Sequence, residues 1–140
     1  GQRSSRLMFP SRRMRSEVMK MLVQIGGVYV LAFAVFHLAF WKLFDWKNEL
    51  PKLKPVNRGV MQVLNIRLTY VFVVVGGLAI FFADELLSTR LGHVILAATS
   101  LFALMRAAEQ LIFWKIEKAS VAFFFILLIG AAMFAAPLFF

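Results

Sequence analysis

Four apolar segments, each long enough to cross a lipid bilayer, follow one another along the 140-residue chain. A membrane-spanning helix needs about 20 mainly apolar residues, and none of the segments alternates apolar and polar residues as barrel strands do. Hydrophobic residues make up 61% of the chain, against about 45–50% in soluble domains. The sequence therefore predicts an all-α membrane protein with spans at about 21–44, 59–83, 91–114 and 119–140.

The connections between these segments predict how the helices are arranged. Residues 84–90 join the second span to the third, and residues 115–118 join the third to the fourth. Links this short place consecutive helices side by side and antiparallel. The first connection is longer and contains Pro51 and Pro55. We expect a four-transmembrane, antiparallel up-down helix bundle over residues 21–140.

A basic segment, residues 1–20, precedes the first span. It holds six of the sixteen Lys and Arg residues, and no basic motif with interleaved aromatic residues accompanies them, so the net charge of +9 does not predict nucleic-acid binding. Basic residues beside a span favour the cytoplasmic side and its anionic lipids. We expect a multi-pass protein of the cell membrane with both termini in the cytoplasm. The segment is either an amphipathic interfacial helix or a flexible tail, and its membrane-surface residues are Arg3, Arg6, Arg12, Arg13, Arg15 and Lys20.

Three polar residues interrupt the third apolar segment. Arg106, Glu109 and Gln110 are three and four residues apart, so they share one face of a helix and can contact one another. A charged group near the bilayer centre costs about 2.5–3.5 kcal/mol on insertion scales and normally faces the bundle interior. We therefore expect Arg106 and Glu109 to form an internal ion pair.

Two other segments carry polar residues at a similar depth in the membrane. His37 in the first segment, and Gln62 and Asn65 in the second, lie level with Arg106 when each helix is measured at about 1.5 Å per residue. Arg67 lies off this polar stripe and is expected to extend to the outer interface, although turned inward it would make the site positively charged. The candidate ligand-binding residues are His37, Gln62, Asn65, Arg67, Arg106, Glu109 and Gln110.

The sequence gives little support for a metal site, a haem site or a common catalytic motif. The absence of cysteine excludes disulfides and thiolate metal ligands. His37 and His93 lie near opposite membrane faces, so they cannot hold one metal or haem iron together. There is no Ser-His-Asp grouping, glycine-rich phosphate loop or pair of carboxylates at one depth. We expect no catalytic residues, no metal site and no nucleic-acid partner, and no cofactor is indicated.

Four sequence stretches carry a resemblance to a known family: FHLAFWKLFDW, NRGVMQVLN, TRLGH and LMRAAEQLIFW. Together they resemble a family of small four-span bacterial integral membrane proteins of unassigned function. The likeness runs from about Val28 to Trp114, and it implies a four-helix bundle without implying an activity. The protein is also similar to DoxX-like membrane proteins in size and architecture, without a shared motif. The resemblance implies these recurring polar positions: His37, Trp41, Asn57, Arg58, Gln62, Asn65, Arg106, Glu109 and Gln110.

Two functions from different classes remain. The small size and the nearly non-polar last segment favour a non-catalytic accessory or scaffold subunit of a larger membrane complex, or a homo-oligomer. Interhelical polar groups would then only hold the helices in register. The alternative is a binding, transport or enzymatic protein with a polar pocket in the outer half of the membrane for a lipid, quinone or small anion. His37 would then carry a proton, and Arg106, oriented by Glu109, would anchor an anion or carbonyl.

Overall fold

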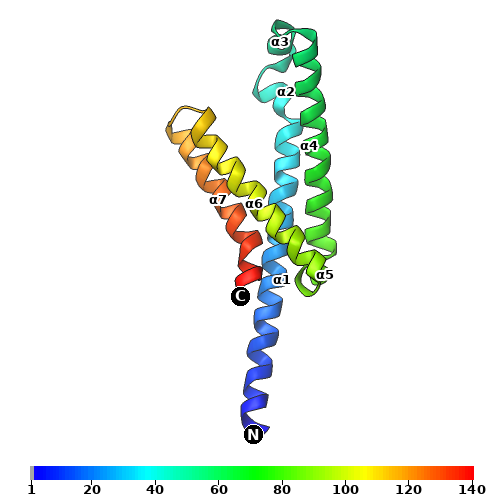
Figure 1. Ribbon diagram of the computed structural model, residues 1–140, viewed down its shortest axis with the longest axis vertical. Coiled ribbons are helices and arrows are strands. Elements are labelled where there is room, and N and C mark those ends of the chain that lie inside the picture. Colours follow the sequence, from blue (N-terminus) through cyan, green and yellow to red (C-terminus); the bar gives the residue numbers. More distant parts are fainter. Residues whose placement is uncertain (1) are drawn as a thin grey trace.

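Four long helices make up most of the chain (Figure 1). The computed structural model describes residues 2–140, with the side chains of residues 12–140. Each long helix has the length and apolar composition of a membrane span. Large apolar side chains such as Leu64, Val73 and Phe125 are exposed on the helices, as contact with lipid requires. The long helices are α1 (Gln2–Leu38), α4 (Pro55–Phe81), α6 (Arg90–Phe113) and α7 (Lys118–Phe139).

The long helices pair as two antiparallel hairpins. α1 packs along α4, and α6 packs along α7, which confirms the predicted antiparallel four-helix fold. The hairpins meet near α5 (Ala83–Ser88), which we call the converging end, and they diverge towards the opposite, open end (Figure 1). The backbone of α4 makes hardly any contact with α6 or α7. This divergence is not predicted by the sequence, and it positions the site described below.

Two glycines allow α1 and α4 to approach closely. A Cβ atom added at Gly27 would lie 2.9 Å from the carbonyl oxygen of Gly76, and one added at Gly76 would lie 3.0 Å from that of Gly27. These distances leave no room for a side chain, and small residues are the usual means by which membrane helices bring their backbones together. Gln24 strengthens the same pair, because its Nε2 donates to the carbonyl oxygen of Ile80 at 3.1 Å.

A folded cap covers the open end of the first hairpin. α1 ends at Leu38 instead of continuing to residue 44 as predicted, and α2 (Phe40–Leu43), α3 (Trp46–Glu49) and η1 (Leu50–Lys52) follow. The apolar residues after Leu38 serve the cap: the Phe40 and Trp46 rings meet with centroids 5.7 Å apart. Asp45 takes the left-handed conformation, with φ of 50°, which turns the chain between α2 and α3. Trp46 and Leu50 are buried.

The converging end is a tight turn between the two hairpins. Thr89 caps α6, because its Oγ1 accepts a hydrogen bond from the backbone nitrogen of Gly92 at 2.9 Å. Any side chain at Gly92 would collide with the backbone of Leu86. An ion pair of 3.0 Å between Lys20 and Asp84 joins α1 to α5. These contacts hold the start of the second hairpin against the first.

The basic N-terminal segment is continuous with α1. The helix begins at Gln2 without a break at Pro10, and its first part projects beyond the bundle (Figure 1). The location of both termini in the cytoplasm stays a prediction. Of the predicted membrane-surface residues, Lys20 pairs with Asp84, Arg12, Arg13 and Arg15 are exposed, and the side chains of Arg3 and Arg6 lie outside those described.

Candidate functional site

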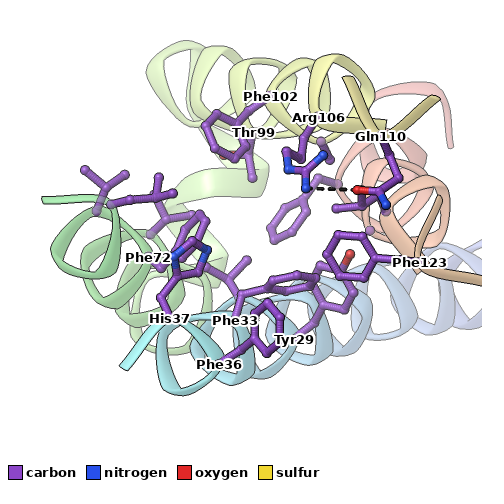
Figure 2. Close-up of a pocket in the computed structure, with 18 of the residues that line it drawn as sticks. Tyr29, Phe33, Phe36, His37, Phe72, Thr99, Phe102, Arg106, Gln110 and Phe123 are labelled. Carbon is purple, nitrogen blue, oxygen red and sulfur yellow. Dashed lines mark hydrogen bonds between the residues drawn. The ribbon is translucent and has the colours of Figure 1, made fainter. Parts of the chain in front are cut away.

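A cleft of about 950 Å³ lies between the two hairpins (Figure 2). All four long helices contribute to its wall, and most of the wall consists of aromatic rings and aliphatic side chains. The volume is at the upper end of the roughly 300–1,000 Å³ typical of small-molecule pockets. The aromatic wall residues labelled in Figure 2 are Tyr29, Phe33, Phe36, Phe72, Phe102 and Phe123.

Aromatic rings bridge the two hairpins at the cleft. Phe72 of α4 and Phe102 of α6 meet edge to face with centroids 5.9 Å apart, and Phe33 of α1 lies at the same centroid distance from Phe123 of α7. Such pairs contribute about 0.5–1.5 kcal/mol beyond the burial of their area. Within the described chain a single hydrogen bond joins the hairpins, from Tyr29 Oη to the carbonyl oxygen of Ile126 at 2.8 Å. The joint is therefore mainly apolar.

Arg106 projects from α6 into the cleft (Figure 2). Its Nη2 donates to Oε1 of Gln110 at 3.0 Å, and Nε2 of Gln110 donates to Oγ of Ser120 on α7 at 2.9 Å. The guanidinium lies 4.8 Å from the ring centroid of Trp114 and 5.5 Å from that of Phe123, within the reach of about 6 Å for cation–π attraction. Gln110 thus positions the guanidinium while tying α6 to α7.

The second terminal nitrogen of Arg106 has no partner. Nη1 is buried, and no atom of the described chain accepts a hydrogen bond from it. Among the described residues, no carboxylate lies within ion-pair distance of Arg106. A buried donor without an acceptor costs about 1–3 kcal/mol, and more when the group is charged. An acceptor from outside the chain would remove this cost.

The predicted ion pair between Arg106 and Glu109 is not formed. Glu109 is exposed, and Arg106 donates instead to Gln110, four residues further along the helix. Both spacings allow contact on a helix. Gln110 is favoured because Ser120 of the neighbouring helix binds its amide and holds the other end of that amide towards the guanidinium.

His37 lies across the cleft from Arg106 and is held by Asn65 (Figure 2). Nδ2 of Asn65 donates to the carbonyl oxygen of His37 at 3.0 Å, and Oδ1 of Asn65 lies 2.8 Å from Nδ1 of His37. The imidazole also contacts Phe40 and Phe72, with ring centroids 4.4 and 5.3 Å away. These contacts fix the position of the ring and join α1 to α4.

The seven predicted ligand-binding residues occupy different places in the structure. His37, Arg106 and Gln110 line the cleft, and Asn65 supports His37 from α4. Gln62 is half-buried on α4 and does not line the cleft, whereas Arg67 and Glu109 are exposed and also lie outside its wall. Depth along each helix therefore predicts which helices carry the polar residues of the site, but not which of those residues line the cleft.

The cleft also contains residues that the sequence reasoning missed. Ser120 lies on the helix expected to offer almost no polar group, yet it binds Gln110. Several phenylalanines, which are not among the candidate ligand-binding residues, also line the cleft. The spacing of Tyr29, Phe33 and Phe36 was an available signal, because rings at intervals of three to four residues form one face of a helix, here beside His37.

Neither a metal-binding cluster among the described residues nor a known relative indicates a function for the cleft. Among the described residues, no group of three or more His, Cys, Asp and Glu side chains is placed to hold a metal ion. Comparison of the chain with models of known protein families, with curated proteins and with solved structures found no match. The four long apolar helices agree with the general resemblance to small four-span membrane proteins.

Proposed function

We propose that this membrane protein binds an amphiphile with an acidic or carbonyl-bearing head group in the cleft between its hairpins. The observation that carries the proposal is the unpartnered, buried Nη1 of Arg106 beside an aromatic cleft. An oxygen atom of the head group would accept a hydrogen bond from Nη1, and hydrogen bonds to charged groups are among the stronger ones in proteins. The apolar part of the ligand would lie against the rings.

A purely structural role does not account for the positive charge of Arg106. The hydrogen bond of Arg106 stays within α6, and it is Gln110 that reaches α7 through Ser120. An uncharged residue at position 106 would leave the Gln110 contact to α7 in place without the cost of burying a guanidinium in the membrane. The presence of a charged residue at position 106 supports a role in binding.

The accessory or scaffold role stays a second proposal. Apolar side chains exposed on all four long helices suit contact with a neighbouring subunit as well as with lipid. Native mass spectrometry of the full chain, released gently from its membrane, separates the two roles. Stoichiometric protein partners without a bound small molecule would support the accessory role, and a single chain retaining one amphiphile would support the binding role.

Binding itself is tested with two single-chain probes, dodecyl phosphate and dodecylphosphocholine. They share an apolar tail and a phosphate, and the choline of the second neutralises the head group. In a maltoside detergent we expect the wild-type chain to prefer dodecyl phosphate by about tenfold, because the choline of the second probe offsets the charge that its phosphate presents to Arg106. Arg106→Leu should abolish this preference.

The matched control is Arg67→Leu, because Arg67 is exposed on α4 outside the cleft. This variant should retain the preference of the wild type, and both variants should keep their helical circular dichroism spectrum. Equal affinity of the wild-type chain for the two probes would refute the proposal without use of any variant. Equal loss of the preference in the Arg67 and Arg106 variants would also refute it.

A further inference from the structure

The hydrogen bonds of Asn65 determine which nitrogen of His37 carries the proton. The carbonyl oxygen of His37 can only accept a hydrogen bond, so the Asn65 atom that faces it at 3.0 Å is the amide nitrogen. The atom that faces Nδ1 of His37 at 2.8 Å is therefore the amide oxygen, which can only accept. Nδ1 of His37 must consequently carry a hydrogen and donate it to Asn65.

This assignment makes the other ring nitrogen of His37 an acceptor. In a neutral imidazole one nitrogen donates and the other accepts, and in the described chain no carboxylate lies within ion-pair distance of His37 to stabilise a second proton. Nε2 makes no hydrogen bond within the described chain, and it is not among the fully buried unpartnered atoms there. The cleft therefore offers a lone pair for a hydrogen-bond donor.

The cleft thus presents two complementary polar groups on facing walls. Arg106 on α6 offers an unused donor with a positive charge, and His37 on α1 offers an unused acceptor (Figure 2). A ligand that satisfies both needs an anionic or carbonyl oxygen at one point of its head group and a hydroxyl at another. An oxidised quinone carries acceptors alone and would leave the lone pair of His37 unmatched.

We infer that the cleft selects an acidic lipid whose head group also carries a hydroxyl, the chemistry of phosphatidylglycerol. The inference rests on the proposed function and names the ligand class of the same site. The phosphate would accept from Arg106, and a glycerol hydroxyl would donate to Nε2 of His37. The lipid tails would lie along the aromatic wall and reach the bilayer between α4 and α6, whose backbones stay apart.

The test compares two acidic lipids of which only one carries head-group hydroxyls. Dioctanoyl phosphatidylglycerol and dioctanoyl phosphatidylmethanol carry the same charge and tails, and the second has no head-group hydroxyl. We expect the wild-type chain to bind the first about two- to twelvefold more tightly, the value of one neutral hydrogen bond. Glycerol 3-phosphate, which has the head chemistry without tails, should show no measurable binding.

Two histidine variants complete the experiment. His37→Phe should bind both lipids equally while still preferring them to dioctanoyl phosphatidylcholine, since Arg106 is intact. His93→Phe is the matched control, because His93 is exposed, bonds to the backbone oxygen of Leu87 and does not line the cleft. It should keep the wild-type preference for phosphatidylglycerol.

The outcomes separate this inference from the proposed function. Equal wild-type affinity for phosphatidylglycerol and phosphatidylmethanol, each tighter than for phosphatidylcholine, would overturn the hydroxyl inference and leave the anion-binding function standing. Equal affinity for all three lipids would overturn both. Binding of glycerol 3-phosphate as tight as that of phosphatidylglycerol would replace the lipid by a soluble anion.

Discussion

Gly76 and Gly77 are neighbours in α4, yet alanine should have opposite consequences at the two positions. A Cβ atom at Gly76 would lie 2.7 Å from both Cγ and Cδ2 of Leu31 and 3.0 Å from the carbonyl oxygen of Gly27, whereas one at Gly77 would meet nothing within 4 Å. Both changes gain the same helix propensity, so their difference isolates the collision. Because the α1 backbone must move, we expect Gly76→Ala to be less stable than Gly77→Ala by about 1–3 kcal/mol.

The measurement is reversible unfolding of both variants in mixed detergent and dodecyl sulfate micelles, followed by circular dichroism. Gly77→Ala should unfold at the same dodecyl sulfate fraction as the wild type or at a higher one, and Gly76→Ala at a lower one. Separation of α1 from α4 should also weaken the contact between His37 and Asn65, which joins the same two helices. Indistinguishable unfolding of the two variants would refute the close packing of α1 on α4.

Two further predictions concern single hydrogen bonds. Ser100→Ala removes the bond of 2.8 Å from Oγ to the backbone of α7 and should cost about 0.6 kcal/mol in the same unfolding assay. The control Thr99→Val loses a bond within α6 alone and should cost less. A greater loss of stability for Thr99→Val than for Ser100→Ala would contradict the role of Ser100 in joining α6 to α7. Nitrogen NMR of labelled histidine should show the proton of His37 on Nδ1, and Asn65→Leu should remove that preference. A proton on Nε2 in the wild type would contradict the acceptor role of His37.

Much of the fold follows from the sequence, because segment length and link length are sufficient to predict antiparallel membrane helices. The divergence of the second hairpin from the first does not follow from segment length and link length. Helix α7 is apolar on nearly every side, so its periodicity does not indicate which face turns towards α1. That orientation depends on the fit of particular side chains, such as the ring of Phe134, which would lie 2.9 Å from a Cβ atom added at Gly26 of α1.

The sequence predicts the depth of the polar site in the membrane, whereas it does not predict each contact within the site. Measurement along each helix places His37, Asn65 and Arg106 at one level, and the structure brings the first two into contact. The choice between Glu109 and Gln110 as the partner of Arg106 could not be made from one helix, because residues at both spacings can reach the guanidinium. Ser120 of the next helix decides it, and sequence spacing does not reveal which residues of two helices face each other.

The distribution of hydrogen bonds has a consequence for how the protein is made. Apart from the Tyr29 hydroxyl, which donates to Ile126 of the second hairpin, the bonded polar side chains between α1 and α4 have their partners before α6 has been synthesised, and those between α6 and α7 are likewise paired within the second hairpin. Each hairpin is therefore suited to enter the bilayer as a unit without leaving these side chains unpaired in lipid. The cleft between the hairpins would then form last, when the two completed halves dock through aromatic rings. The bonds within the hairpins are Gln24–Ile80 and His37–Asn65 in the first, and Ser100–Ala131 and Gln110–Ser120 in the second.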